Sequence, residues 1–265
     1  MDKHTLIKKA FAGIGYPEGI TCAACNNELH ESSRYGLCPD CLVPFISHCC
    51  KRCGTALAER GREYCDKCLH GGDYAFDAAR APFPYERESV HKLVWGLKYA
   101  KQPYYAGLMA VPMTEFLATL GWEFDAITFV PLHPKKEYKR TYNQSKLLAG
   151  HISEACGVPV LSTMKKTTYS KKSATSLGRE DRARLLERSF EMLPGTDVKS
   201  KRLLLIDDVY TTGATANECA KTLKSAKAKA VYVLTYATSR GDRPITYDPA
   251  AEEEYIAKLR RMRSR

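Results

Sequence analysis

Cysteine pairs are the most concentrated chemical feature of this sequence. The chain holds eleven cysteines, and eight of them form C-x-x-C pairs: Cys22/Cys25, Cys38/Cys41, Cys50/Cys53 and Cys65/Cys68. A C-x-x-C turn presents two sulfurs to one side, and a hairpin of about a dozen residues brings a second such turn to face it. Twelve residues separate the first two pairs and eleven separate the last two. We therefore expect two sites, each with four thiolates around one Zn²⁺ ion.

The choice of ligands leaves some alternatives open. Cys49 stands one residue too early for the C-x-x-C spacing to Cys53, so we assign Cys50 as the ligand and leave Cys49 spare. Gly54 follows that pair at a point where a tight backbone turn is needed. An interleaved arrangement, in which the first pair joins the third, remains open, and so do redox dithiols. Four thiolates leave no coordination position for a substrate, so we interpret the metal as structural.

Two adjacent carboxylates form the second chemical feature. The apolar run 203–206 leads into Asp207 and Asp208, and Thr211-Thr212-Gly213-Ala214-Thr215 follows. A buried strand would deliver both carboxylates at its carboxyl end, where ligands bind in open α/β sheets, so we expect them to face a ligand and not the core. The Thr/Gly loop would open a helix whose free N–H groups, hydroxyls and dipole form a cradle for phosphate. The two carboxylates could accept hydrogen bonds from the ring hydroxyls of a sugar, and the loop could hold its phosphate group. The pattern therefore predicts a site for a phosphorylated sugar.

The alternative for this stretch is an ordinary strand-to-helix turn with an aspartate cap. Other nucleotide-binding motifs give no competing interpretation, because the sequence has neither G-x-x-x-x-G-K-[ST] nor a G-x-G-x-x-G after a strand. The sequence therefore supports neither a P-loop NTPase nor a Rossmann dehydrogenase.

Alternating strands and helices must position these residues. Apolar residues spaced three and four apart predict helices, and short apolar runs predict buried strands. We expect helices at 87–100, about 105–120, about 146–156 and 213–227, and strands at 126–130, 202–206 and 230–237. Strands that alternate with helices predict an α/β fold with a mostly parallel sheet and flanking helices.

Length and composition bound the organisation of the chain. Its 265 residues have room for one α/β domain and a smaller module, and a hydrophobic content of 44 % supports a proper core. We expect residues 1–72 to form the cysteine module with a short lead-in, 73–240 the α/β domain and 241–265 a basic extension. The net charge of +11 permits anionic partners, either nucleic acid or phosphate compounds, without choosing among them.

The sequence also bears on location. No apolar run approaches the roughly 20 residues that cross a bilayer, so we expect no membrane insertion. The first residues show no continuous apolar stretch of the kind that marks a secretory signal. Clustered C-x-x-C pairs are metal ligands in a reducing compartment more often than disulfides. We therefore expect a cytoplasmic protein.

These motifs together resemble a known family. The stretch 202–215 resembles the motif with which type I phosphoribosyltransferases bind phosphoribosyl pyrophosphate (PRPP). With the cysteine pairs, the chain to about residue 240 resembles the ComF competence-protein family, whose members join a double zinc ribbon to such a domain. The resemblance extends to further places: Tyr85, Leu97-Lys98-Tyr99, Val130-Pro131-Leu132 and Asn143-Gln144.

The resemblance implies a ligand and a role for each residue. A type I phosphoribosyltransferase-like domain would bind PRPP with Mg²⁺. Asp207 and Asp208 would hold the ribose hydroxyls, and Thr211 to Thr215 would surround the 5′-phosphate. The loop on the pyrophosphate side would consist of Pro131, Leu132 and His133, and we interpret His133 as a loop residue and not as a general base. Arg140, Asn143 and Gln144 would open the next helix beside that loop, and Arg140 is the third catalytic candidate.

The sequence departs from the family pattern in the region before residue 190. Ala174 and Leu185 stand where the family has Gln and Asn, whereas Leu177, Arg182 and Phe190 fit. By resemblance, this region is the loop that closes over substrate. The basic residues among 165–188 fit a solvated face, capture of pyrophosphate, or contact with a nucleic-acid backbone.

Two functions remain open. The first is an enzyme, a Mg²⁺-dependent phosphoribosyltransferase that moves the pentosyl group of PRPP to an acceptor that the sequence does not identify. The second, implied by the resemblance, is a factor in DNA uptake and natural transformation or in related DNA or nucleotide metabolism. In that case the zinc ribbons and basic surfaces would handle single-stranded DNA or a DNA-uptake helicase, and the PRPP site would be regulatory or vestigial.

Overall fold

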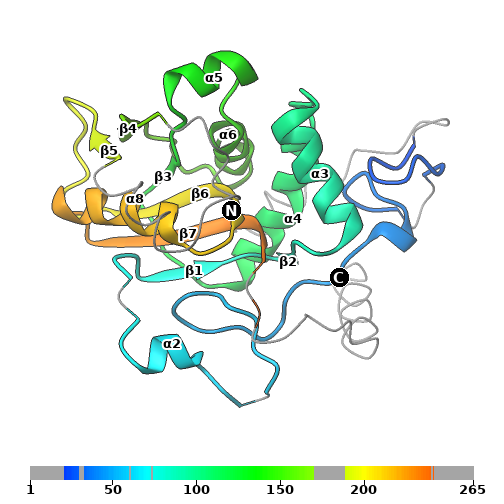
Figure 1. Cartoon of the computed structure of the whole chain (residues 1–265), viewed down its shortest axis with the longest axis horizontal. Helices are drawn as coiled ribbons and strands as arrows, with labels where there is room; N and C mark the ends of the chain where they lie inside the picture. The colour runs from blue at the N-terminus through cyan, green and yellow to red at the C-terminus, as the bar shows by residue number, and fades with distance from the viewer. Residues whose placement is uncertain are drawn as a thin grey trace.

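A parallel β-sheet forms the centre of the fold (Figure 1). The computed structural model describes residues 21–29, 33–59, 61–72, 74–169, 189–239 and 241. The sheet contains β1 (Ala78–Arg80), β2 (Phe83–Pro84), β3 (Ala126–Phe129), β6 (Arg202–Tyr210) and β7 (Ala230–Thr238). Its order is β1-β7-β6-β3, with β2 also paired to β7, and every pairing in it is parallel. Helices cover both faces of such a sheet, which is why its strands are continuous apolar runs.

Helices pack against the two faces of the sheet. One apolar cluster joins α3 (Glu88–Tyr99), α4 (Tyr105–Thr119) and α6 (Gln144–Cys156) to the sheet residues Leu204, Ile206 and Leu234. The other joins α8 (Ala214–Ser225) to Leu203, Leu205 and Val233. Successive side chains of a strand point to opposite faces, so alternate residues of β6 belong to opposite clusters.

Shorter elements complete the described chain. They are the 3₁₀ turn η1 (Pro39–Cys41), α2 (Asp66–Leu69), α5 (Pro134–Arg140), and the antiparallel pair β4 (Met164–Lys166) and β5 (Phe190–Met192). α5 lies between β3 and α6, at the end of the sheet to which the carboxyl ends of the strands point (Figure 1).

The two cysteine-rich segments pack against different parts of the α/β unit. In the first, the Tyr105 hydroxyl of α4 donates to the Ala23 carbonyl at 2.9 Å, and Arg34 pairs with Glu115 of α4 at 3.2 Å. In the second, the Ala79 N–H of β1 donates to the Arg52 carbonyl at 2.9 Å. Both segments contribute cysteines to the apolar clusters of the sheet, so each shares a core with the larger domain.

The predicted fold class and elements are confirmed, with three differences. The strand predicted at 202–206 continues to Tyr210, because β7 supplies backbone partners as far as that residue. α6 begins earlier than expected, at Gln144, because Asn143 caps it. Sequence periodicity missed β1, β2, β4, β5 and α5, which are too short to show a period.

In the described part of the chain, no helix combines the length and apolar character that a membrane span requires.

Three predicted segments lie outside the described residues. They are the lead-in to the cysteine module, 1–20, most of the basic stretch, 170–188, and the basic extension from residue 242 onward. The division of the chain at residues 72 and 240 stays a prediction.

Candidate functional site

Two groups of four cysteines come together in the structure. They are Cys22, Cys25, Cys38 and Cys41, and Cys50, Cys53, Cys65 and Cys68. Within each group all Sγ atoms lie within 4.8 Å of one another. The nearest approaches that join the two halves of a group are 3.5 Å, between Cys25 and Cys38 and between Cys53 and Cys65. A tetrahedral zinc site with Zn–S bonds of about 2.3 Å places its sulfurs about 3.8 Å apart. Each group could therefore hold a zinc ion.

The predicted pairing of the cysteines is confirmed. The first pair joins the second and the third joins the fourth, so the interleaved arrangement is wrong. Cys49 belongs to neither group. Gly54 has the predicted tight turn, with φ of +69°, and a Cβ there would lie 2.4 Å from the Ala79 carbonyl oxygen. Glycine at this position therefore lets the second cysteine segment approach β1.

The thiols in each group cannot all ionise side by side. The hydrogen bond from Cys53 is the main cause that lowers the pKa of Cys50 to about 4, in spite of its burial. Burial, together with neighbouring Cys50 and Cys65, raises the pKa of Cys68 to about 12. A divalent cation stabilises all four thiolates at once. The donor set and its spacing fit a metal with thiolate preference.

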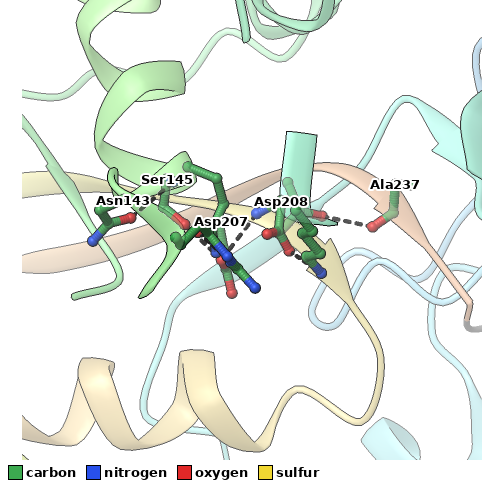
Figure 2. A network of polar contacts seen from close by, with 9 residues as sticks. Asn143, Ser145, Asp207, Asp208 and Ala237 are labelled. Atoms are coloured by element: carbon green, nitrogen blue, oxygen red, sulfur yellow. Dashed lines mark hydrogen bonds and ion pairs between the residues drawn. The ribbon is translucent and has the colours of Figure 1, made fainter. Parts of the chain in front are cut away.

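Asp207 and Asp208 lie near the carboxyl end of β6 and have different partners. The carboxylate of Asp208 meets Lys98 of α3, and that of Asp207 meets Ser145 of α6. The backbone N–H of Asp208 donates to Oδ1 of Asp207 at 2.9 Å (Figure 2). The expectation that neither carboxylate is packed in the core is wrong for Asp208, which is 3 % exposed. The strand continues to Tyr210, so Asp208 does not lie at its open end.

Lys98 of α3 is the partner of Asp208. Its Nζ lies 2.7 Å from Oδ1 of Asp208. Burial acts to lower the pKa of Lys98, but the charge and hydrogen bond of Asp208, aided by the charge of Asp207, raise it overall. The ammonium is therefore held in its charged form. Oδ2 of Asp208 is buried and has no hydrogen-bond partner among the described residues.

Ser145 of α6 is the partner of Asp207. Its hydroxyl donates to Oδ1 of Asp207 at 2.8 Å (Figure 2). Burial and the neighbouring charge of Asp208 raise the pKa of Asp207 to about 7, although Lys98 and the Ser145 hydrogen bond oppose the change. Asp207 is thus poised between its two protonation states near neutral pH.

Asn143 connects this pair to the loop that follows β3. Its Oδ1 accepts from the N–H groups of Ser145 and Lys146, at 2.9 and 3.3 Å, and caps α6. Its Nδ2 donates to the Val130 carbonyl at 3.0 Å. Pro131 to His133 follow directly, and Nδ1 of His133 accepts from the Lys135 N–H at 3.2 Å and caps α5. His133 is thus a loop residue with a capping role, as its sequence position indicated.

Arg140 ends α5 beside the same loop. Its Nη1 donates to Oε1 of Gln144 at 2.6 Å, and its guanidinium lies over the ring of Tyr99, 5.5 Å from the centroid. Thr141 follows in the left-handed conformation, φ 74°, which turns the chain from α5 into α6. Arg140 therefore bridges α5, α6 and α3.

The Thr/Gly loop opens α8 as predicted. Gly213 has φ of +79° and lies against Tyr210, where a Cβ would come within 2.3 Å of the hydroxyl oxygen. The Ala214 N–H donates to the Thr212 hydroxyl at 3.3 Å. Among the described residues, the N–H groups of Thr212, Gly213 and Thr215 have no acceptor. The loop thus keeps the free donors that a phosphate would need.

The predicted site residues come from three neighbouring segments. They are the end of β6 with the following loop, the loop after β3, and the turn into α6. Sequence reasoning missed the ion pair of Lys98 and the hydrogen bond of Ser145. Lys98 belongs to the stretch Leu97-Lys98-Tyr99 that carries the family resemblance, but nothing in its spacing indicates that it reaches β6. Ser145 directly follows Asn143-Gln144 in the sequence, and only the fold shows that its hydroxyl points toward Asp207.

Curated relatives match most of the chain. Competence protein F of Haemophilus influenzae is 27 % identical over 219 residues, covering 80 % of this chain and 94 % of that protein. DNA utilization protein YhgH of Escherichia coli K12 is 26 % identical, covering 80 % and 87 %. Competence protein ComFC of Streptococcus pneumoniae is 36 % identical over 102 residues, 38 % of this chain and 43 % of that one. The chain is thus similar, over most of its length, to proteins named for competence and DNA utilization. No family model matches the chain.

Solved structures overlap this chain only in part. Glutamine PRPP amidotransferase from Bacillus subtilis aligns with 53 % of this chain and 30 % of its own, at 21 % identity and a TM-score of 0.37. Adenine phosphoribosyltransferase from Leishmania tarentolae aligns with 52 % and 60 %, at 16 % identity and a TM-score of 0.34.

Proposed function

We propose that the protein binds PRPP at the carboxyl end of β6 and acts in DNA uptake or in related DNA or nucleotide metabolism. The observation that carries the proposal is the Thr/Gly loop at the start of α8, where the N–H groups of Thr212, Gly213 and Thr215 have no acceptor among the described residues. A phosphate group would supply the missing acceptors. In the strand that leads into this loop, the buried Oδ2 of Asp208 has no hydrogen-bond donor among the described residues, which costs about 1–3 kcal/mol. The relatives named for competence and DNA utilization support the wider role.

Each part of the ligand has a matching part of the site. Asp208 and Asp207 would accept from the ribose hydroxyls, and Thr211 to Thr215 with the free N–H groups at the start of α8 would take the 5′-phosphate. Pro131, Leu132 and His133 would line the pyrophosphate side, and Arg140 would supply positive charge there. Mg²⁺ prefers one or two carboxylates together with substrate phosphates, and the partly exposed Asp207 suits it best. When bound, the ion would neutralise the charge of the pyrophosphate.

Two roles of the bound PRPP stay open. As a phosphoribosyltransferase, the protein would transfer the ribose 5-phosphate group to an acceptor and release pyrophosphate. As a DNA-handling factor, it would use the cysteine segments for single-stranded DNA or a helicase partner, with PRPP as a regulatory ligand or the site as a vestige. We also propose that both cysteine groups hold structural Zn²⁺ and that the protein is cytoplasmic.

Calorimetry with PRPP, with and without Mg²⁺, tests the proposal. We expect saturable binding that Asp207→Asn weakens by about ten-fold to a hundred-fold, since one charge-assisted hydrogen bond is worth about 1.5–3 kcal/mol. The matched control is Asp197→Asn, which changes an exposed aspartate that precedes β6 and pairs with Lys201, and it should leave affinity unchanged. Equal PRPP affinity of the parent and Asp207→Asn would show that the motif is assigned wrongly.

A second assay separates the two roles. Pyrophosphate release from PRPP is measured with and without single-stranded DNA. Release that depends on an added acceptor supports the transferase. Tight PRPP binding without release under any of these conditions supports the regulatory role.

A further inference from the structure

Two large aromatic side chains on α3 are exposed without an evident structural reason. Trp95 is 52 % exposed and Tyr99 is 59 % exposed. They lie four residues apart on one helix face, and their ring centroids are 6.3 Å apart. Single exposed aromatics are ordinary, whereas neighbouring ones form a contiguous apolar patch of the kind that binding surfaces use.

α3 is firmly seated where these residues occur. Its opposite face, with Leu93, Val94 and Leu97, is at most 1 % exposed. The Tyr142 hydroxyl donates to the Leu97 carbonyl at 2.6 Å, which ties the last turn of α3 to the chain between α5 and α6. The exposure of Trp95 and Tyr99 is therefore a property of the folded helix.

The aromatic pair adjoins the candidate PRPP site. Lys98, which binds Asp208, is the neighbour of Tyr99 and stands three residues after Trp95. Arg140 covers the Tyr99 ring and bonds Gln144, which precedes the Ser145 that holds Asp207. Lys101 is exposed just beyond the helix. Lys98 and Arg140 therefore link the pair to the residues that hold both aspartates, and the guanidinium of Arg140 lies over one of its rings.

We propose that Trp95 and Tyr99, together with Arg140, form a stacking site for a planar heteroaromatic base beside the PRPP site. Aromatic faces combined with cations are the chemistry that binds nucleobases and their phosphates. An apolar protein partner would not need the cations, and two side chains cover far less than the roughly 1,000 Å² of a specific protein interface. The inference rests on the proposed function, because a base bound beside the site would act together with bound PRPP. The base is either a free nucleotide or part of a single strand.

Tryptophan fluorescence tests the stacking site directly. The chain has two tryptophans, and Trp122 is stacked on Tyr232 at 4.9 Å. In a Trp122→Phe variant the tryptophan signal comes from Trp95. We expect dTMP or an oligo(dT) strand to quench it saturably, whereas ribose 5-phosphate, which has no base, should not. Quenching by the strand alone assigns the base to a polynucleotide, and quenching by dTMP at a similar affinity assigns it to a mononucleotide.

Matched variants locate the effect. Tyr99→Ala in the same background should weaken binding of the base about ten-fold, as expected for the loss of one stacking partner. Tyr64→Ala removes a tyrosine that is 38 % exposed in the second cysteine segment and should change nothing. If Trp122→Phe does not fold, the parent is compared with Trp95→Phe, because a ligand signal present only in the parent belongs to Trp95.

The outcomes separate this inference from the proposed function. PRPP binding by calorimetry without any quenching of Trp95 would overturn the stacking site and leave the proposed function standing. Failure of PRPP to bind would overturn the proposed function, and base-dependent quenching would then still establish the stacking site.

Discussion

At the scale of single residues, Asp207 and Asp208 are chemically equal in the sequence and different in the fold. Asp208 is buried against the ammonium of Lys98, and Asp207 accepts from a serine hydroxyl and a backbone N–H. The two adjacent carboxylates therefore meet different helices, α3 and α6. A substitution at each position should therefore have a different cost.

Asp208→Asn should destabilise the folded protein. The change leaves the Lys98 ammonium, whose side chain is only 20 % exposed, without its counter-charge. Breaking a buried pair on one side costs about 3 kcal/mol, whereas replacing both partners by neutral groups costs less. We expect Lys98→Met combined with Asp208→Asn to recover part of that loss in urea unfolding. If the double variant is less stable than Asp208→Asn, the ion pair is not the cause.

Asp207 should make both stability and ligand affinity depend on pH. Burial and the charge of Asp208 raise its pKa to about 7 in the folded chain, compared with about 3.9 when unfolded. The folded state binds the Asp207 proton more tightly than the unfolded state does. Protonation of Asp207 therefore stabilises the folded protein fully below about pH 4, and this contribution is lost as the pH rises to about 7. Asp207→Asn should remove this part of the slope of unfolding free energy against pH.

The affinity for PRPP should change with pH in the opposite direction to the stability of the folded protein. Sugar hydroxyls donate to the ionised carboxylate, so PRPP affinity should rise between about pH 6 and about pH 8 as Asp207 loses its proton. PRPP also titrates, so the measured quantity is the difference between parent and Asp207→Asn in calorimetry at each pH. A difference that is constant across this range would contradict the assignment.

At the scale of elements, the amino end of α6 aligns the site. Asn143 caps the helix and holds the carbonyl at the end of β3, and the next turn presents Ser145 to β6. One side chain thus sets the spacing of two loops that a ligand would touch. Asn143 is 4 % exposed, so its hydrogen bonds do not compete with solvent.

Two substitutions at Asn143 should separate its two contacts. Asn143→Ala removes the cap and the donor to Val130, and we expect a loss of about 1–3 kcal/mol in unfolding free energy. Asn143→Asp keeps the capping oxygen but places a carboxylate against the Val130 carbonyl. It should retain α6 by circular dichroism and still weaken PRPP binding. Full affinity in Asn143→Asp would show that the loop after β3 does not depend on this bond.

At the scale of the whole molecule, the cysteine segments are part of the same packed body as the sheet. Cys22 and Cys38 belong to the apolar cluster of α3 and α4, and Cys50 and Cys53 pack with the cluster of Phe76 and Ala79. Their ordering therefore supports both faces of the α/β unit. Loss of metal should therefore lower the stability of the α/β unit as well as that of the cysteine segments.

Metal analysis of the reduced protein should find two zinc ions per chain. Cys50→Ser should lower this number, while Cys49→Ser, which changes a cysteine outside both groups, should leave it at two. Chelation should also lower the thermal midpoint of the α/β unit, because Cys50 and Cys53 contact its core. One zinc ion or none in freshly reduced parent protein would contradict this prediction.

The sequence by itself determined the features that depend on local spacing. The C-x-x-C gaps favoured the grouping of the eight cysteines, because a hairpin of about a dozen residues can bring two neighbouring pairs together, and the structure excluded the interleaved alternative. Apolar runs and helical periods gave the long elements, and Gly213 with its threonines marked the loop into α8, because local backbone geometry demands those residues. Elements such as β1 and α5 have too few residues to show a period.

Only the tertiary structure decided which distant side chains meet. Lys98 and Asp208 are far apart in the sequence, and their ion pair exists because α3 packs on the face of the sheet to which Asp208 points. The same packing leaves Trp95 and Tyr99 exposed beside Arg140. Such contacts depend on how helices cross a sheet, and no pattern of neighbouring residues encodes that crossing.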